Sequence, residues 1–131
     1  MKYERVSQEE LHKLDKEFID FLVVNGITAK DWINLKENEP LVANEIIDQF
    51  SDVVWESILR STSYLQKIEK NNAYYFKCDK NTIHLIMVDD TSNLKKSTEK
   101  KYTKTRELEM FEMIKKGCQI SDGKYFELLN Q

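Results

Sequence analysis

The sequence predicts an α+β fold: three N-terminal helices, a small three-stranded antiparallel sheet and two C-terminal helices around one core. Three observations indicate this fold. A long segment with helical apolar periodicity fills residues 40–60, strand-like segments separated by turn residues follow it, and capping signals recur on both sides. With 131 residues and only three Gly and one Pro, we expect one helix-rich domain spanning residues 1–131.

Two capped helices are predicted before the long one. Ser7 and Glu10 have the spacing of a capping box, and Gly26 suits the left-handed position that ends the helix. Between them the apolar residues recur at intervals of three and four: Leu11, Leu14, Phe18, Phe21 and Leu22. Thr28 and Asp31 then predict the start of a second, shorter helix.

The third helix, residues 40–60, is the longest periodic segment. Pro40 stands at the first helical position, where its missing N–H costs nothing. A broad apolar arc is formed by Val42, Ile46, Ile47, Phe50, Val53, Val54 and Ile58. Because so little of its surface is polar, we expect other elements to pack on two sides of this helix.

Strand periodicity follows the third helix. The expected strands are residues 63–69, 73–78 and 82–88, although 63–69 also fits an extension of the helix. Residues 89–103 are polar and predict a loop. Two further helices are expected, one from about residue 104 to 116 and one capped by Ser121.

Three blocks of sequence resemble a family of small bacterial proteins catalogued as a domain of unknown function. They are FSDVVWESIL at 50–59, FKCDKNTIHLIMV at 76–88 and KKYTKTRELEMFEMIKKG at 100–117. Members of this family carry a longer segment where this chain has only residues 89–99. The resemblance implies one compact bacterial domain and brings no activity, cofactor or partner with it.

Composition and termini narrow the class of protein. The N-terminal ten residues are charged, and no window approaches 18 apolar residues, so neither a signal peptide nor a membrane span is predicted. Two cysteines without CxxC spacing are typical of reduced thiols, and we expect a cytoplasmic protein. Residues 1–60 carry 7 Lys/Arg and 13 Asp/Glu, a balance of −6, whereas residues 61–131 carry 13 and 10, a balance of +3.

An acidic ridge on the third helix is the first candidate site. The acidic ridge consists of Glu45, Asp48, Asp52 and Glu56, which stand on successive turns. Trp55 lies beside it and suits an interface anchor. The ridge fits a docking surface for a basic protein partner, a solvated helix face or a divalent-cation site. We predict protein-partner binding, and no metal, because the Glu-x-x-His pairs of di-metal helical sites are missing.

A basic segment within residues 95–106 is the alternative site. It contains Lys95, Lys96, Lys100, Lys101, Tyr102, Lys104 and Arg106. Cations with an interleaved aromatic suit phosphate contact and base stacking, as in a nucleic-acid- or ribosome-associated factor. The sequence pI of about 5.5 is unlike that of most such domains, and a solvated loop or a contact with an acidic protein also fits.

Cys78 and His84 are the remaining residues with chemistry of their own. They flank a turn, so a zinc-like cluster or a Cys–His nucleophile can be considered. One thiolate and one imidazole are too few ligands, and no P-loop, G-x-G-x-x-G or H-E-x-x-H motif is present. We therefore predict a non-enzymatic interaction or regulatory protein, with no catalytic residues and no cofactor.

Overall fold

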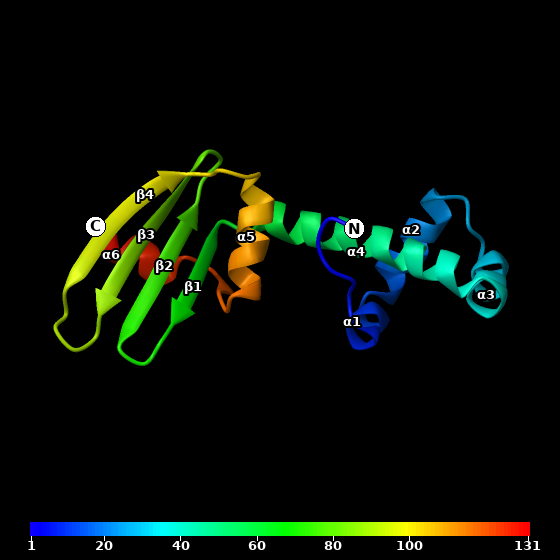
Figure 1. The fold of residues 1–131 in the computed structure, drawn as a ribbon, viewed down its shortest axis with the longest axis horizontal. Coiled ribbons are helices and arrows are strands. Elements are labelled where there is room, and N and C mark those ends of the chain that lie inside the picture. Colours follow the sequence, from blue (N-terminus) through cyan, green and yellow to red (C-terminus); the bar gives the residue numbers. More distant parts are fainter. The chain divides into compact units, whose positions relative to one another are not determined.

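A computed structural model describes residues 1–131 as six helices and a five-stranded sheet. The α+β class is confirmed, with two more strands and one more helix than expected. The chain divides into two compact units, residues 1–57 and residues 58–131, and each is described by itself (Figure 1).

Unit 1 is helical. It contains α1 (Gln8–Lys13), α2 (Asp15–Val24), α3 (Ala29–Asn38) and the part of α4 (Pro40–Ser61) that ends at Ser57. Its connections are short, as the closely spaced helix start signals predict. No helix in either unit combines the length and apolar composition that a bilayer span requires.

The predicted helix signals of unit 1 are confirmed with one exception. Ser7 and Thr28 each form a complete capping box. Gly26 takes the expected left-handed conformation, with φ +74°. The first predicted helix is instead two, because Leu14 adopts φ −100° and ψ 25°, which interrupts the helical backbone between α1 and α2.

The core of unit 1 lies between α2 and one side of α4. Its buried residues are Phe18, Leu22, Ile47 and Phe50. The ring of Phe18 packs on those of Trp32 and Phe50, with both centroid distances at 5.0 Å. On α4 the apolar arc is buried over a narrower range than predicted, since Val42 and Val53 remain 39% and 54% exposed. The helices of unit 1 pack around Ile46, Ile47, Phe50 and Val54, and they do not cover Val42 and Val53.

Unit 2 is built on the sheet, whose strand order is β4-β3-β2-β1-β5 with every neighbouring pair antiparallel. Its elements are β1 (Tyr64–Ile68), β2 (Asn72–Cys78), β3 (Thr82–Asp89), β4 (Lys95–Lys101), α5 (Arg106–Lys115), β5 (Gln119–Ser121) and α6 (Lys124–Leu129). The three expected strands are confirmed, and residues 63–69 are strand over Tyr64–Ile68 rather than helix.

Two predictions about unit 2 are wrong. The polar loop 89–103 contains strand β4, which pairs with β3 from Val88↔Lys95 to Thr82↔Lys101. Every residue of β4 is exposed, so no buried face imposed an apolar alternation on its sequence. Ser121 does not cap the last helix, because it lies in β5 and pairs with β1.

The register assigns side chains to the two faces of the sheet. Leu65, Phe76, Leu85 and Thr98 stand opposite one another across four strands and share one face. Helix α6 packs on the other face through Phe126, which is 3% exposed (Figure 1). We call these the α5 face and the α6 face, because α5 borders the first.

Candidate functional site

The acidic ridge holds the chain's own N-terminal segment, which we define as residues 2–6. The Asp52 carboxylate accepts hydrogen bonds from the backbone N–H groups of Lys2 and Tyr3, at 2.7 and 2.8 Å. Glu56 accepts from the Tyr3 hydroxyl and lies 3.2 Å from the Lys2 ammonium. Two of the four ridge carboxylates therefore anchor the first residues of the chain.

A third ridge carboxylate does the same. The Arg5 guanidinium donates to both oxygens of Asp48, with Nε at 2.5 Å and Nη2 at 3.0 Å. This hydrogen bond lowers the pKa of Asp48 below its ordinary value. The Val6 N–H donates to the Ser51 hydroxyl at 3.0 Å, which completes the attachment of the N-terminal segment to α4.

The remaining two ridge predictions have different surroundings. Glu45 is exposed, whereas Trp55 is partly buried. The cations that meet the ridge, Lys2 and Arg5, were visible in the sequence. Their spacing of three residues did not indicate that they would meet a helix of the same unit.

The basic segment is divided between two faces of an edge strand. On β4, Lys96 and Lys100 point to the α5 face, while Lys95 and Lys101 point to the α6 face. Lys95 donates from Nζ to the Leu129 carbonyl at the end of α6, at 2.7 Å. These four cations do not form one surface.

The residues after β4 are also engaged within unit 2. The Tyr102 hydroxyl donates to the Asp79 carbonyl at 2.9 Å, and burial raises its pKa. Lys104 lies 2.6 Å from Glu112, an ion pair that raises the pKa of the lysine. Nucleic-acid binding by this segment stays a prediction. Lys95 and Lys104 already have partners within unit 2 and are less available to phosphates than the sequence suggests.

Arg106 has a structural position. Its guanidinium donates to three backbone carbonyls, those of Leu59, Thr62 and Cys78. Leu59 lies in the last turn of α4 and Thr62 follows the helix, a region where carbonyl groups lack i+4 helical partners. Cys78 is the last residue of β2. Its side chain is 15% exposed, so Arg106 is not presented to a phosphate backbone.

Cys78 and His84 do not form a catalytic or ligating pair. Cys78 pairs with Ile83 across β2 and β3, so the next residue, His84, points to the opposite face. Cys78 is 3% exposed, and burial raises its pKa to about 11. His84 lies between Asp79 and Glu99, at 2.9 and 3.1 Å. No group of three or more His, Cys, Asp and Glu side chains has an arrangement that could hold a metal ion.

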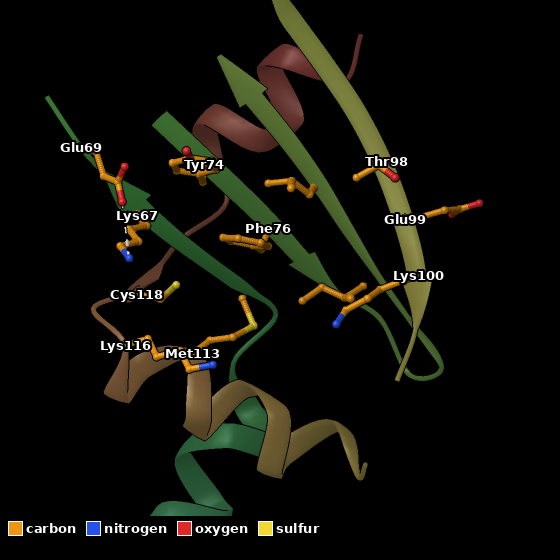
Figure 2. Close-up of a pocket in the computed structure, with 12 residues that line it drawn as sticks. Lys67, Glu69, Tyr74, Phe76, Thr98, Glu99, Lys100, Met113, Lys116 and Cys118 are labelled. Carbon is orange, nitrogen blue, oxygen red and sulfur yellow. Dashed lines mark ion pairs between the residues drawn. The ribbon is translucent and has the colours of Figure 1, made fainter. Parts of the chain in front are cut away.

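A hollow of about 550 Å³ lies on the α5 face, between the sheet and α5 (Figure 2). Its floor is apolar and consists of Tyr74 and Phe76 from β2 and Ile83 and Leu85 from β3. Met113 and Cys118 line it from α5 and the residues that follow. Figure 2 shows the Phe76 ring in the middle of the floor, with Met113 extending toward it.

The hollow exists because one helix is too narrow for the sheet. Four strand spacings place the outer strands about 19 Å apart, whereas one helix covers only about 10 Å. The ten-residue α5 contributes the fully buried Met110 at one end of the face. Beyond it Tyr74, Phe76 and Leu85 are only partly buried. Apolar area therefore remains in contact with water.

The rim of the hollow carries cations from three parts of unit 2. Lys67 lies 3.5 Å from Glu69, and Lys100 lies 3.7 Å from Glu109. The Lys67–Glu69 pair is a surface pair of the kind that contributes less than about 1 kcal/mol, so Lys67 can exchange its partner. In the second pair Lys100 is largely exposed, whereas the Glu109 side chain is only 12% exposed. Lys116, just after α5, has no ion-pair partner.

The sequence contained part of the signal for this hollow. Strand alternation places Tyr74 and Phe76 on one face of β2, but aromatic residues in a strand are most often core residues. A sheet with apolar residues on both faces of β2 and β3 needs more helix on each face than α5 and α6 provide.

Comparison with known proteins gives a family and no function. The family described as "Family of unknown function (DUF6495)" matches residues 1–98 and 87–131. No curated protein and no solved structure matches the chain. The two matched ranges overlap in residues 87–98. Because the matched ranges together span residues 1–131, the chain belongs to this family of unknown function, DUF6495.

Proposed function

We propose that this protein is a small non-enzymatic interaction protein, and that the hollow on the α5 face receives a helix of a partner protein. The observation that carries this proposal is the partly exposed apolar floor formed by Tyr74, Phe76 and Leu85. Apolar area that a fold leaves uncovered next to a cavity is typical of an interaction site.

A helix is the occupant that suits this surface best. Faces of sheets are covered by helices in two-layer folds, and here apolar side chains of β2 and β3 remain only partly covered. The hollow is lined by Tyr74, Phe76 and Met113, and aromatic residues and methionine are enriched at the centres of protein interfaces. The hollow is open to solvent on one side, so a small molecule would stay largely exposed in it.

The acidic ridge is a less favourable place for the partner. Asp48, Asp52 and Glu56 already hold the N-terminal segment, so a basic partner would have to displace five residues and their hydrogen bonds. We therefore place the interaction in the hollow and give the ridge a structural role within unit 1.

Neighbouring residues of β4 provide a matched test. Thr98 borders the hollow, whereas Ser97 points to the α6 face, and both are exposed. A photo-crosslinking amino acid is placed at each position in the native cell. We expect a discrete protein adduct from position 98 and not from position 97.

The captured protein is then purified and its affinity measured directly. Thr98→Trp fills the hollow and should weaken binding by at least about tenfold, while Ser97→Trp should leave it unchanged. Circular dichroism and thermal unfolding establish that both variants are folded. Equal affinity for the two variants would show that the partner binds elsewhere and would overturn the proposal.

A further inference from the structure

The charges around the hollow carry an inference about the chemistry of its partner. We infer that the hollow recognises an acidic amphipathic helix, with an apolar stripe against the floor and Asp or Glu residues along both flanks. This inference rests on the proposed function, because it specifies which helix occupies the same site.

Lysines stand on both sides of the apolar floor. Lys67 from β1 and Lys116 from the end of α5 line one side, and Lys100 from β4 lines the other (Figure 2). Lys96 points to the same face of β4, although it does not line the hollow. Cations therefore flank an apolar centre, which is the complement of an apolar stripe between acidic flanks.

The nearby carboxylates neutralise part of this charge and leave Lys116 without an ion-pair partner. Glu69 neutralises Lys67, and Glu109 neutralises Lys100, so neither carboxylate offsets the charge of Lys116. Glu99 borders the hollow, but its carboxylate lies 3.1 Å from Nδ1 of His84 on the opposite face. Lys116 remains available to a partner's carboxylate, and Lys67 can exchange its exposed partner Glu69 for another carboxylate at little cost. Lys100 is largely exposed and can contact a further carboxylate beside Glu109.

The spacing of the lysines fits the width of a helix. Strands β1 and β4 are separated by three strand spacings, about 14 Å. A helix with its side chains measures about 10–12 Å across. A helix lying over β2 and β3 would bring its two flanks beside the lysines of β1 and β4, with its apolar stripe over Phe76 and Leu85.

These charges contribute more to specificity between partner helices than to binding affinity. Rim ion pairs are exposed and screened by salt, so apolar contact with the floor must supply most of the binding. A helix with basic flanks would meet the unpaired Lys116 on one side and could offer no carboxylate to Lys67 or Lys100, which disfavours that partner. The structure thus predicts a strong preference between helices that differ only in the sign of their flanking charges.

The test uses the full chain and three synthetic peptides of about 20 residues, a length that forms a helix readily. They share one leucine stripe and differ only in their flanks, which are Glu, Gln or Lys. Affinity is measured by fluorescence anisotropy, and the contact surface is mapped by amide chemical shifts. We expect the Glu peptide to bind at least about tenfold more tightly than the Lys peptide at low salt, with shifts confined to the hollow.

Charge-reversal variants locate the effect. Lys116→Glu and Lys100→Glu should each weaken the Glu peptide and strengthen the Lys peptide. Lys124→Glu makes the same charge change on α6, away from the hollow, and should alter neither affinity. Raising the salt to about 0.5 M should reduce the preference for the Glu peptide.

The outcomes separate this inference from the proposed function. If all three peptides bind in the hollow with equal affinity, the acidic preference is wrong and the hollow remains a helix-binding site. If the crosslinked partner binds elsewhere and no peptide shifts the hollow residues, both are wrong. Laurate is the control for a small ligand. If laurate binds stoichiometrically in the hollow and none of the peptides binds there, the helix is overturned as the occupant.

Discussion

Replacement of Arg106 by methionine is the sharpest test of how unit 2 is held together. The guanidinium links the end of α4 to the end of β2 through the carbonyls of Leu59, Thr62 and Cys78. Methionine is similar in length to arginine and resembles its apolar stem, so Arg106→Met removes the donors while conserving most of the packing.

The expected loss follows from the hydrogen bonds. A hydrogen bond that involves a charged group contributes about 1.5–3 kcal/mol net, and a buried carbonyl left without a donor costs about 1–3 kcal/mol. Three such bonds are lost from a side chain that is only 15% exposed. The Leu59 carbonyl keeps the Thr62 N–H as a donor, and carbonyls at a helix end regain some contact with water. We expect Arg106→Met to lower the free energy of unfolding of unit 2 by about 3–5 kcal/mol.

The assay must observe unit 2 itself. Both tryptophans, Trp32 and Trp55, lie in unit 1, so tryptophan fluorescence does not report on the sheet. Amide hydrogen exchange of β2 and β3 measures the free energy directly. Lys101→Met on exposed β4 is the control, with an expected change below about 0.5 kcal/mol. A loss below about 1 kcal/mol for Arg106→Met would refute this role for the guanidinium.

Three further predictions concern backbone strain, thiol reactivity and pH. Gly123→Ala should destabilise its unit by about 1–3 kcal/mol more than Gly26→Ala does, as measured by hydrogen exchange. Both glycines have a positive φ, but only at Gly123 would an added Cβ meet an aromatic ring, that of Tyr64 at 2.4 Å. Because burial raises the pKa of Cys78 to about 11, iodoacetamide at about pH 8 should alkylate it at least about 100-fold more slowly in the native chain than in urea, and equal rates would contradict the burial. Because Arg5 lowers the pKa of Asp48 in the folded state, this contact stabilises the N-terminal segment above the ordinary carboxyl pKa and is lost as pH falls through the lowered pKa. Hydrogen exchange of the segment should show that loss in the wild type, whereas Asp48→Asn should weaken protection near neutral pH; an unchanged protection in Asp48→Asn would contradict the contact.

The helices of unit 1 were predictable because their signals are local. The capping boxes at Ser7 and Thr28 and the left-handed Gly26 fix where helices begin and end, whatever lies around them. The extent of burial on α4 was not predictable in the same way. Val53 belongs to the apolar arc by spacing, yet it is 54% exposed, because burial depends on which elements pack nearby.

The missed strands depended on contacts distant in sequence or on backbone pairing alone. Residues 95–101 contain four lysines and no apolar residue, so only their hydrogen bonds to β3 make them a strand. Residues 119–121 are too short for any periodicity and pair with β1, more than 50 residues earlier. Neither pairing leaves a trace in composition.

The candidate sites show the same limit. The acidic ridge is correctly located on one face of α4, but the sequence did not show that the N-terminal segment covers Asp48, Asp52 and Glu56. The hollow was missed because it depends on area that α5 leaves uncovered. Apolar residues such as Phe76 read as core until the number and position of the covering helices are known.

Hydrogen exchange of the full chain, with and without the purified partner, tests the central claim most directly. We predict that the partner slows exchange in β2 and β3 beneath the hollow and in α5 beside it, with the N-terminal segment and α4 unchanged. Slower exchange confined to the acidic ridge and residues 2–6, with no change in the sheet, would contradict the account.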